Sequence, residues 1–172
     1  MNETNPKSPI QGLAVRYTEP GDGKHLKEWL MEPGILRWFP MLDEVEIDDA
    51  VPRWIAFCRY KCSLTVTLDG APCGIATLYL QPYKKLAHQC EFGIVVGTGY
   101  RNKGIGSYLL GCLMHLAKEQ FHINLLHLQV YAENPAIGLY KRFGFKEFGR
   151  QSHWIKELDG RYVARVFMER FL

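Results

Sequence analysis

The apolar positions between residues 105 and 121 follow the spacing of one face of a helix. They recur at intervals of three and four residues, which places them on one continuous stripe of about four turns. The positions are Ile105, Tyr108, Leu109, Cys112, Leu113, Leu116, Ala117 and Phe121. An apolar run, Phe92–Val96, precedes them, and the glycine-rich stretch Gly97–Ser107 lies between. The pattern therefore predicts a buried strand, a tight turn and the start of a long helix.

Alternating and apolar runs elsewhere predict further strands. With the strand before the long helix, the expected strands are 13–17, 63–68, 72–80, 87–96, 125–131, 145–148 and 162–170. Asp69-Gly70 separates two of these runs by the dipeptide typical of a tight hairpin, and Asp159-Gly160 does the same near the end of the chain.

Three more helices are expected from their start and stop signals. One runs from the Gly21–Gly23 turn to Leu30. A second starts at Asp48 or Asp49, with Pro52 in its first turn, and passes through Arg59. A third is capped by Asn134, has Pro135 in its first position and ends at Gly144. Residues 31–40 hold two prolines and a glycine, so we expect a short irregular connector there.

This order of elements predicts an α/β fold of the α+β type. Only the strands on either side of the long helix are joined by a connection suited to a parallel pair. We therefore expect a mixed, mostly antiparallel twisted sheet of about seven strands flanked by about four helices. The 172 residues are expected to form one domain, 13–172, preceded by a flexible tail, 1–12.

Composition narrows the class of protein. A net charge of +3 is too small to indicate nucleic-acid binding, although it suits an anionic cofactor. No stretch approaches the ~20 apolar residues of a membrane span, and the polar segment 1–9 does not resemble a signal peptide. The five cysteines are scattered without a Cys-x-x-Cys spacing, so we expect reduced thiols and no metal site in a cytoplasmic protein.

The turn before the long helix has the features of an anion-binding site. The first N–H groups of a helix have no partner within the helix, and the helix dipole favours negative charge there. Gly104 and Gly106 leave these groups accessible, while Arg101 and Lys103 add positive charge. The order of lysine and glycine is wrong for a P-loop, and Asn102 stands where a dinucleotide-binding fingerprint has its third glycine. A solvated basic turn that only caps a core helix is the plainer alternative.

The segment Arg101-Asn-Lys-Gly104-Ile-Gly106 resembles the Arg/Gln-x-x-Gly-x-Gly/Ala signature of the GNAT superfamily of N-acetyltransferases. A second segment, Asn134-Pro-Ala-Ile-Gly-Leu-Tyr140-Lys-Arg-Phe-Gly-Phe145, resembles the other GNAT signature, except that Ile137 replaces an alanine. Two signatures in this order, about 30 residues apart, are more specific than either alone. Within the superfamily the chain looks most like the branch of spermidine and ribosomal-protein N-terminal acetyltransferases.

The resemblance implies acetyl-CoA as the cosubstrate and a sheet that splays between the strands at 87–96 and 125–131. The pantetheine arm is then expected along the open strand edge and at Asn134, and the pyrophosphate at the helix start. Gly93 is expected to form a bulge that begins the splay. The implied cofactor-binding residues are Ile94, Val95, Val96, Arg101, Asn102, Lys103, Gly104, Ile105, Gly106, Ser107, Asn134 and Tyr140.

Two side chains are candidates for the chemistry of amine acetylation. The resemblance implies that Tyr140 is the acid that protonates the departing thiolate, although a core aromatic on a helix face would give the same pattern. Glu91 lies on the strand face opposite Cys90, Phe92, Ile94 and Val96. It is a candidate base through water, a candidate anchor for a cationic substrate, or a structural ion pair.

The acceptor is expected to bind between residues 28–46 and the turn 81–85, with Trp29, Trp38, Phe39 and Glu91 as candidate contacts. The sequence thus predicts an acetyl-CoA-dependent N-acetyltransferase that acts as a monomer or homodimer. Its acceptor is a small-molecule or peptide amine: a polyamine, amino acid, antibiotic or protein N-terminus. The alternative is a non-catalytic module of the same fold that binds coenzyme A as a sensor. No metal, nucleic-acid or membrane partner is expected.

Overall fold

The computed structural model describes residue 8 and residues 10–172, so most of the expected tail at 1–12 lies outside the described residues. The described residues form seven strands: β1 (Leu13–Tyr17), β2 (Ser63–Leu68), β3 (Ala71–Leu80), β4 (Gln89–Val96), β5 (Leu125–Tyr131), β6 (Lys146–Lys156) and β7 (Tyr162–Phe171). The α-helices are α1 (Gly23–Leu30), α2 (Pro33–Leu36), α3 (Glu44–Ile55), α4 (Ile105–Phe121) and α5 (Ala136–Arg142). Short 3₁₀ helices cover Pro20–Asp22, Ala56–Tyr60, Lys84–Leu86 and Thr98–Tyr100.

The strands form one sheet in the order β1-β2-β3-β4-β5-β7-β6, in which only β4 and β5 are parallel. The predicted mixed, mostly antiparallel α/β fold is therefore confirmed. Asp69 and Gly70 both have positive φ, 49° and 83°, as the tight turn between β2 and β3 requires.

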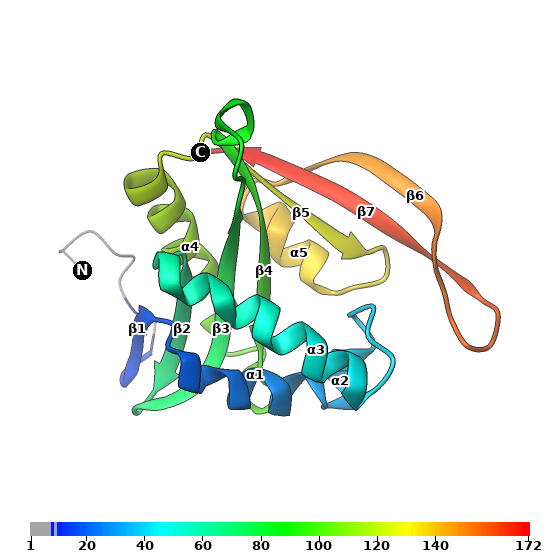
Figure 1. Cartoon of the computed structure of the whole chain (residues 1–172), viewed down its shortest axis with the longest axis horizontal. Helices are drawn as coiled ribbons and strands as arrows, with labels where there is room; N and C mark the ends of the chain where they lie inside the picture. The colour runs from blue at the N-terminus through cyan, green and yellow to red at the C-terminus, as the bar shows by residue number, and fades with distance from the viewer. Residues whose placement is uncertain (1–7, 9) are drawn as a thin grey trace.

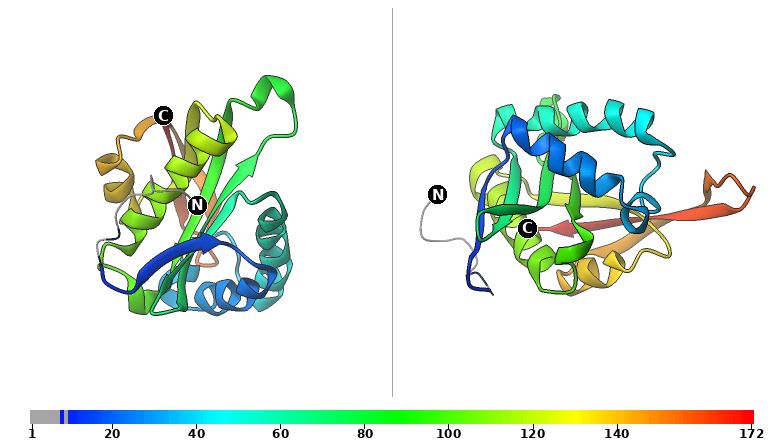
Figure 2. Two further views of the ribbon diagram at one scale, coloured as in Figure 1. Left: turned by 90° about the vertical axis from the view of Figure 1, so that its left-hand side faces the viewer. Right: turned by 90° about the horizontal axis from the view of Figure 1, so that it is seen from below.

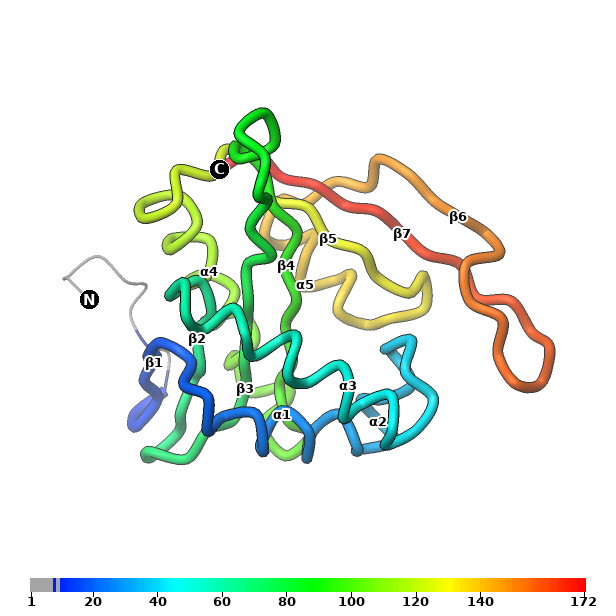
Figure 3. The backbone as a smooth tube through the Cα atoms, in the orientation of Figure 1, coloured from blue at the N-terminus to red at the C-terminus, as the bar shows by residue number. Residues whose placement is uncertain are grey.

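The sheet opens between β4 and β5. These strands pair over only three residues each, Gln89–Glu91 with Leu125–His127, and then diverge (Figure 1). The smooth backbone trace shows the same wedge, which widens toward the C-terminal ends of both strands (Figure 3). The predicted splay between these strands is confirmed.

The helices cover the two faces of the sheet unequally. α4 and α5 pack on one face, in a core that includes Phe92, Leu109, Leu128 and Met168. α1 and α3 cover the other face over β3 and β4, around a second core that includes Trp54 and Val95. The β6–β7 hairpin reaches past these helices, as the views in Figure 2 show.

Predictions of local structure were wrong at four places: the start of α3, the connector at 31–40, Gly93 and the length of β6. α3 begins at Glu44 instead of Asp48 or Asp49, because the Asp43 side chain accepts a hydrogen bond from the Glu46 N–H and caps the helix earlier. Pro52 consequently lies in the C-terminal half of α3. The connector at 31–40 contains one helical turn, α2.

The third error concerns Gly93, which forms no bulge, because the register between β3 and β4 is unbroken from Cys90 to Val96. The glycine is needed for space instead. A Cβ at residue 93 would lie 2.4 Å from the Tyr79 hydroxyl and 2.9 Å from the Trp54 ring.

Candidate active site

A cavity of about 480 Å³ occupies the wedge between β4 and β5. Its walls come from both strands, from the loop before α4, from the start of α5 and from the segment after α2. It therefore lies where the sheet opens and where α4 begins. The residues that line it and that the sequence singled out are Trp38, Phe39, Ile94, Val95, Val96, Arg101, Asn102, Gly104, Gly106, Ser107, Asn134 and Tyr140.

The start of α4 forms one end of this cavity. Gly104 precedes the helix with φ +79°, and no side chain among the described residues caps the first turn, so its N–H groups stay available to a ligand. A Cβ at Gly106 would find its nearest neighbours, Leu139 and Val96, at 3.8 Å. The protein itself thus leaves room at residue 106, and an anion can approach the helix start through that space.

The two basic side chains of this loop differ in position. Arg101 lines the cavity, where its Nε donates to the Val96 carbonyl at 3.1 Å and its guanidinium donates to the Gly34 carbonyl at 3.2 Å. Burial lowers the pKa of Arg101, and the charge of Glu32 opposes that shift. Lys103 instead donates to the Gly99 carbonyl on the surface, and it does not line the cavity.

The edge of β4 that faces the wedge carries backbone groups without a partner strand, of which the Val96 carbonyl accepts from Arg101. The Gly97 N–H donates to the Cys73 carbonyl on β3, and backbone groups alternate in direction along a strand. Val96 and Ile94 therefore direct their N–H and C=O groups toward the wedge, whereas those of Val95 face β3. The Val95 side chain lies in the core under α1 and α3.

Tyr140 lies at the inner wall of the cavity, on α5. Its ring packs edge-on against Phe92 and Phe145, with centroids 6.0 and 6.1 Å apart, and the side chain is 7% exposed. Burial raises the pKa of the phenol, so it is protonated at neutral pH. Its hydroxyl makes no hydrogen bond to the described residues. Tyr140 can therefore donate its proton to a group in the cavity.

Asn134 lines the cavity next to the start of α5. Its Oδ1 accepts from the Ala136 N–H at 2.9 Å, so the side chain has the predicted capping role. Pro135 lies at the boundary of the helix, which begins one residue later than expected.

Glu91 lies on β4 at the point where the pairing with β5 ends. Its Oε2 accepts a hydrogen bond of 2.9 Å from the amide nitrogen of Gln129, which lines the cavity. Burial raises the pKa of Glu91, while the charge of Arg165 and the Gln129 hydrogen bond act in the opposite direction. A carboxylate with a raised pKa can accept a proton near neutral pH.

Sequence reasoning missed Gln129 and Arg165. The Gln129 Oε1 is the single buried side-chain polar atom of the described residues that has no hydrogen-bond partner. Arg165 lies opposite Tyr131 in the β5–β7 pairing. An available signal was that Gln129 and His127 are polar residues that alternate with apolar ones in this strand, and Gln129 lies two positions beyond His127, the partner of Glu91.

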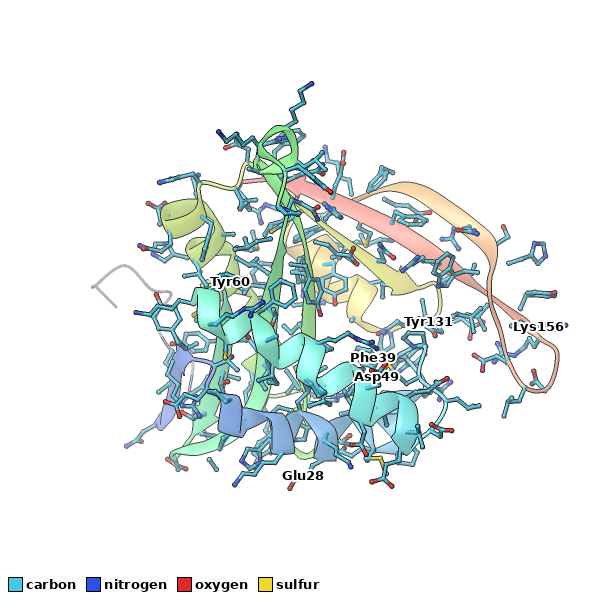
Figure 4. The ribbon with its side chains drawn as sticks, viewed as in Figure 1. Glu28, Phe39, Asp49, Tyr60, Tyr131 and Lys156 are labelled. Atoms are coloured by element: carbon cyan, nitrogen blue, oxygen red, sulfur yellow. The ribbon has the colours of Figure 1, made fainter. Side chains whose placement is uncertain are left out.

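The candidate acceptor contacts do not all meet at the cavity. Trp38 and Phe39 line it, and Trp38 packs edge-on against Tyr131 at 6.4 Å. Figure 4 shows Phe39 and Tyr131 on the side of the molecule where β4 and β5 diverge. Trp29, by contrast, is 5% exposed and packs in the core against Gly97, because its position on α1 faces the sheet.

The expected contribution of the turn 81–85 is not found, because the turn joins β3 and β4 at the end of the sheet remote from the wedge (Figure 1). The five cysteines are free, as expected, and four of them are buried. Among the described residues, no group of three metal-ligating side chains occurs. None of the described helices is long and apolar enough to cross a membrane.

Comparison with known proteins connects this arrangement with a family. A profile of the acetyltransferase (GNAT) family matches residues 24–145. The chain is similar to the L-amino acid N-acetyltransferase AaaT of Escherichia coli K12, with 29% identity over 108 residues, 62% of this chain and 66% of that protein. It is also similar to the N-alpha-acetyltransferase of Sulfurisphaera tokodaii, with 38% identity over 71 residues, 41% of this chain and 42% of that protein. The chain thus spans less than two thirds of the length of either relative.

A solved structure shares the whole fold. The structure of yncA from Salmonella typhimurium with its cofactor acetyl-CoA has a TM-score of 0.77, with 19% identity over 94% of this chain and 95% of that one.

Proposed function

Because the chain belongs to the GNAT family of acetyltransferases, we propose that it transfers the acetyl group of acetyl-CoA to a primary amine. The observation that carries the proposal is the cavity in the β4–β5 wedge. It joins an uncapped helix start, an open strand edge and a protonated phenol. Glu91, a carboxylate with a raised pKa, does not line the cavity itself but accepts a hydrogen bond from Gln129, which does. These are the groups that the transfer of an acyl group to an amine requires.

The residues of the cavity fit an extended anionic cosubstrate. The N–H groups at the start of α4 and the space at Gly106 suit a pyrophosphate. The open edge at Ile94 and Val96 suits the amide groups of a pantetheine arm, which would add to the sheet like a further strand. Asn134 and Tyr140 border the same path, with Tyr140 at its inner wall.

Acetyl-CoA, when bound, supplies an acetyl thioester whose carbonyl carbon an amine can attack. Glu91 takes a proton from the incoming ammonium, directly or through water, so that the nitrogen can form its bond to carbon. Free backbone N–H groups of the β4 edge are available for the negative charge that develops on oxygen. Tyr140 gives its phenolic proton to sulfur as the carbon–sulfur bond breaks, and the phenolate then takes the surplus proton of the acylated nitrogen, which leaves a neutral amide.

We propose an α-amine as the acceptor among the possible amines. The two curated relatives are named for L-amino acids and for N-alpha acetylation, and both names specify amines next to a carbonyl carbon. Trp38, which packs on Tyr131, and Phe39 give this end of the cavity an aromatic wall suited to a side chain of the acceptor.

The test is a thiol-release assay with acetyl-CoA and separate classes of amine: amino acids, peptides, polyamines and amino-sugar antibiotics. Release of coenzyme A that depends on one of these classes, with the acetylated product identified by mass, supports the proposal. Binding of acetyl-CoA without release in the presence of any amine would support the non-catalytic sensor instead.

A further inference from the structure

Arg165 of β7 lies on the same face of the sheet as Glu91 and Gln129. In the β5–β7 pairing Arg165 is opposite Tyr131, two residues along β5 from Gln129 and on the same face. The charges of Arg165 and Glu91 affect each other, since each shifts the pKa of the other toward the ionised pair. No carboxylate of the described residues comes within 4.0 Å of the guanidinium. The two opposite charges are thus neighbours that do not touch.

The guanidinium of Arg165 is held in place by aromatic rings. It stacks over Trp154 at 3.7 Å and lies 5.3 Å from the centroid of Phe167. Stacking occupies the flat face of a guanidinium and leaves the N–H groups at its edge for other partners. Those N–H groups make no hydrogen bond to the described residues. Arg165 is therefore a fixed, partly buried cation with its hydrogen-bonding edge available.

Glu91 and Gln129 together offer hydrogen-bond acceptors, whereas Arg165 offers donors. The carboxylate of Glu91 and the unpartnered Oε1 of Gln129 are both acceptors, and one hydrogen bond fixes their relative position. A buried acceptor without a donor is unfavourable, and an ammonium group, which carries three donors, would supply the missing bond.

We propose that Arg165 binds the carboxylate of the acceptor and that the acceptor is a free α-amino acid. Such a zwitterion carries an ammonium and a carboxylate on one carbon atom. Its ammonium would meet Glu91 and Gln129, while its carboxylate would accept from the edge of Arg165 in a charge-assisted, two-point contact. The inference rests on the proposed acetyl transfer and narrows its acceptor from α-amines in general to free α-amino acids. A polyamine would bring positive charge against Arg165, and a peptide would offer a neutral amide there.

The test compares each L-amino acid with its own α-amide, which keeps the amine and the side chain but lacks the negative charge. We expect the wild-type kcat/KM for the acid to exceed that for the amide by on the order of 10²-fold. In Arg165→Gln this ratio falls to about one, chiefly because KM for the acid rises, while Arg165→Lys keeps part of the preference. The ratio is used because loss of Arg165 also raises the pKa of Glu91, which affects both acceptors equally.

Arg150→Gln is the matched control. It removes the same charge from the same hairpin, but Arg150 lies opposite Val166 on the other face and pairs with Glu147. The control should keep the wild-type ratio. Titration calorimetry with coenzyme A present measures binding directly, and it should rank the acid above the amide in wild type, as the kinetics do. If Arg165→Gln does not fold, the same comparison is made in Arg165→Lys.

Two different failures can be told apart. If amides, peptides or polyamines are acetylated as well as the acids are, the carboxylate subsite is wrong, although the acetyltransferase assignment stands. If no amine promotes thiol release although acetyl-CoA binds, the proposed function itself fails, and the acceptor inference fails with it.

Discussion

The Gln129 amide donates to Glu91 at 2.9 Å, while the oxygen of the same amide is buried without a donor. The first contact favours the ionised form of Glu91, against the effect of burial. The second leaves one acceptor unused inside the cavity wall. A single side chain therefore tunes the candidate base and presents an acceptor to a substrate.

Gln129→Met should move the acidic limb of the pH–rate profile to higher pH. The Gln129 hydrogen bond lowers the pKa of Glu91, so its loss raises that pKa, and fewer molecules carry an ionised base at a given acidic pH. On the acidic limb, at pH well below that pKa, we expect kcat/KM to fall about fivefold, the equivalent of one net hydrogen bond of ~1 kcal/mol. An unshifted limb would contradict a role of Gln129 in setting this pKa.

Glu91→Gln separates the three interpretations of this carboxylate. As a base, its loss cuts the rate at neutral pH, and higher pH restores part of it because more amine is already neutral. As an anchor, its loss chiefly raises KM for cationic acceptors. We expect both effects together, measured as kcat and KM between pH 6 and 10.

The stability of Glu91→Gln tests the structural interpretation. Burial raises the pKa of Glu91, so the neutral carboxyl stabilises the fold at low pH, and this contribution is lost as the pH rises through the folded-state pKa. Above that pKa, a permanently neutral glutamine should leave the melting temperature unchanged or higher. Normal kinetics with a clearly lower melting temperature would instead identify a structural ion.

Tyr140→Phe removes a hydroxyl that makes no hydrogen bond to the described residues and leaves the ring packing in place. We expect turnover to fall by ~10²-fold, the scale of general acid catalysis, with little change in acetyl-CoA affinity or melting temperature. Tyr60→Phe, at an exposed tyrosine far from the wedge (Figure 4), is the control and should behave as wild type. Undiminished turnover in Tyr140→Phe would make Tyr140 a packing residue.

Gly106→Val tests the cosubstrate. A Cβ at residue 106 has room, so the free protein should fold, but the added branches enter the space before α4. In wild type, acetyl-CoA should raise the melting temperature by linkage, and ATP and NAD should not. The shift should be largely lost in Gly106→Val. Equal stabilisation of wild type by ATP would count against acetyl-CoA as the natural ligand.

Most of the cofactor side of the site follows from local sequence, and most of the acceptor side does not. The strand, glycine turn and helix from Phe92 to Phe121 are contiguous, so periodicity locates them within a residue or two. Arg165, however, reaches β5 only because β7 inserts between β5 and β6 in the sheet, an order that no local pattern encodes. The role of Gly93 was wrongly predicted for the same reason, because the side chains that leave no room for a Cβ at residue 93, Tyr79 and Trp54, belong to other elements.

The length of β6 was also missed. The sequence predicted a strand over 145–148, whereas β6 extends to Lys156. Its outer residues are exposed on both faces, so they lack the alternation by which a half-buried strand is recognised. Two irregularities in its pairing with β7 further disturb the period of two.

The projecting β6–β7 hairpin has a consequence for how this protein could diverge. Arg165, Trp154 and Phe167 lie on the hairpin, whereas the helix start and open edge that suit the cosubstrate belong to β4 and α4. Only three residue pairs join β4 to β5, and the hairpin extends beyond the helices. Mutations can therefore accumulate on the hairpin and change which amine is accepted without weakening the cosubstrate end. Descendants of this chain could thus acquire new acceptors by drift in one hairpin, while selection on the other half of the cavity stays constant.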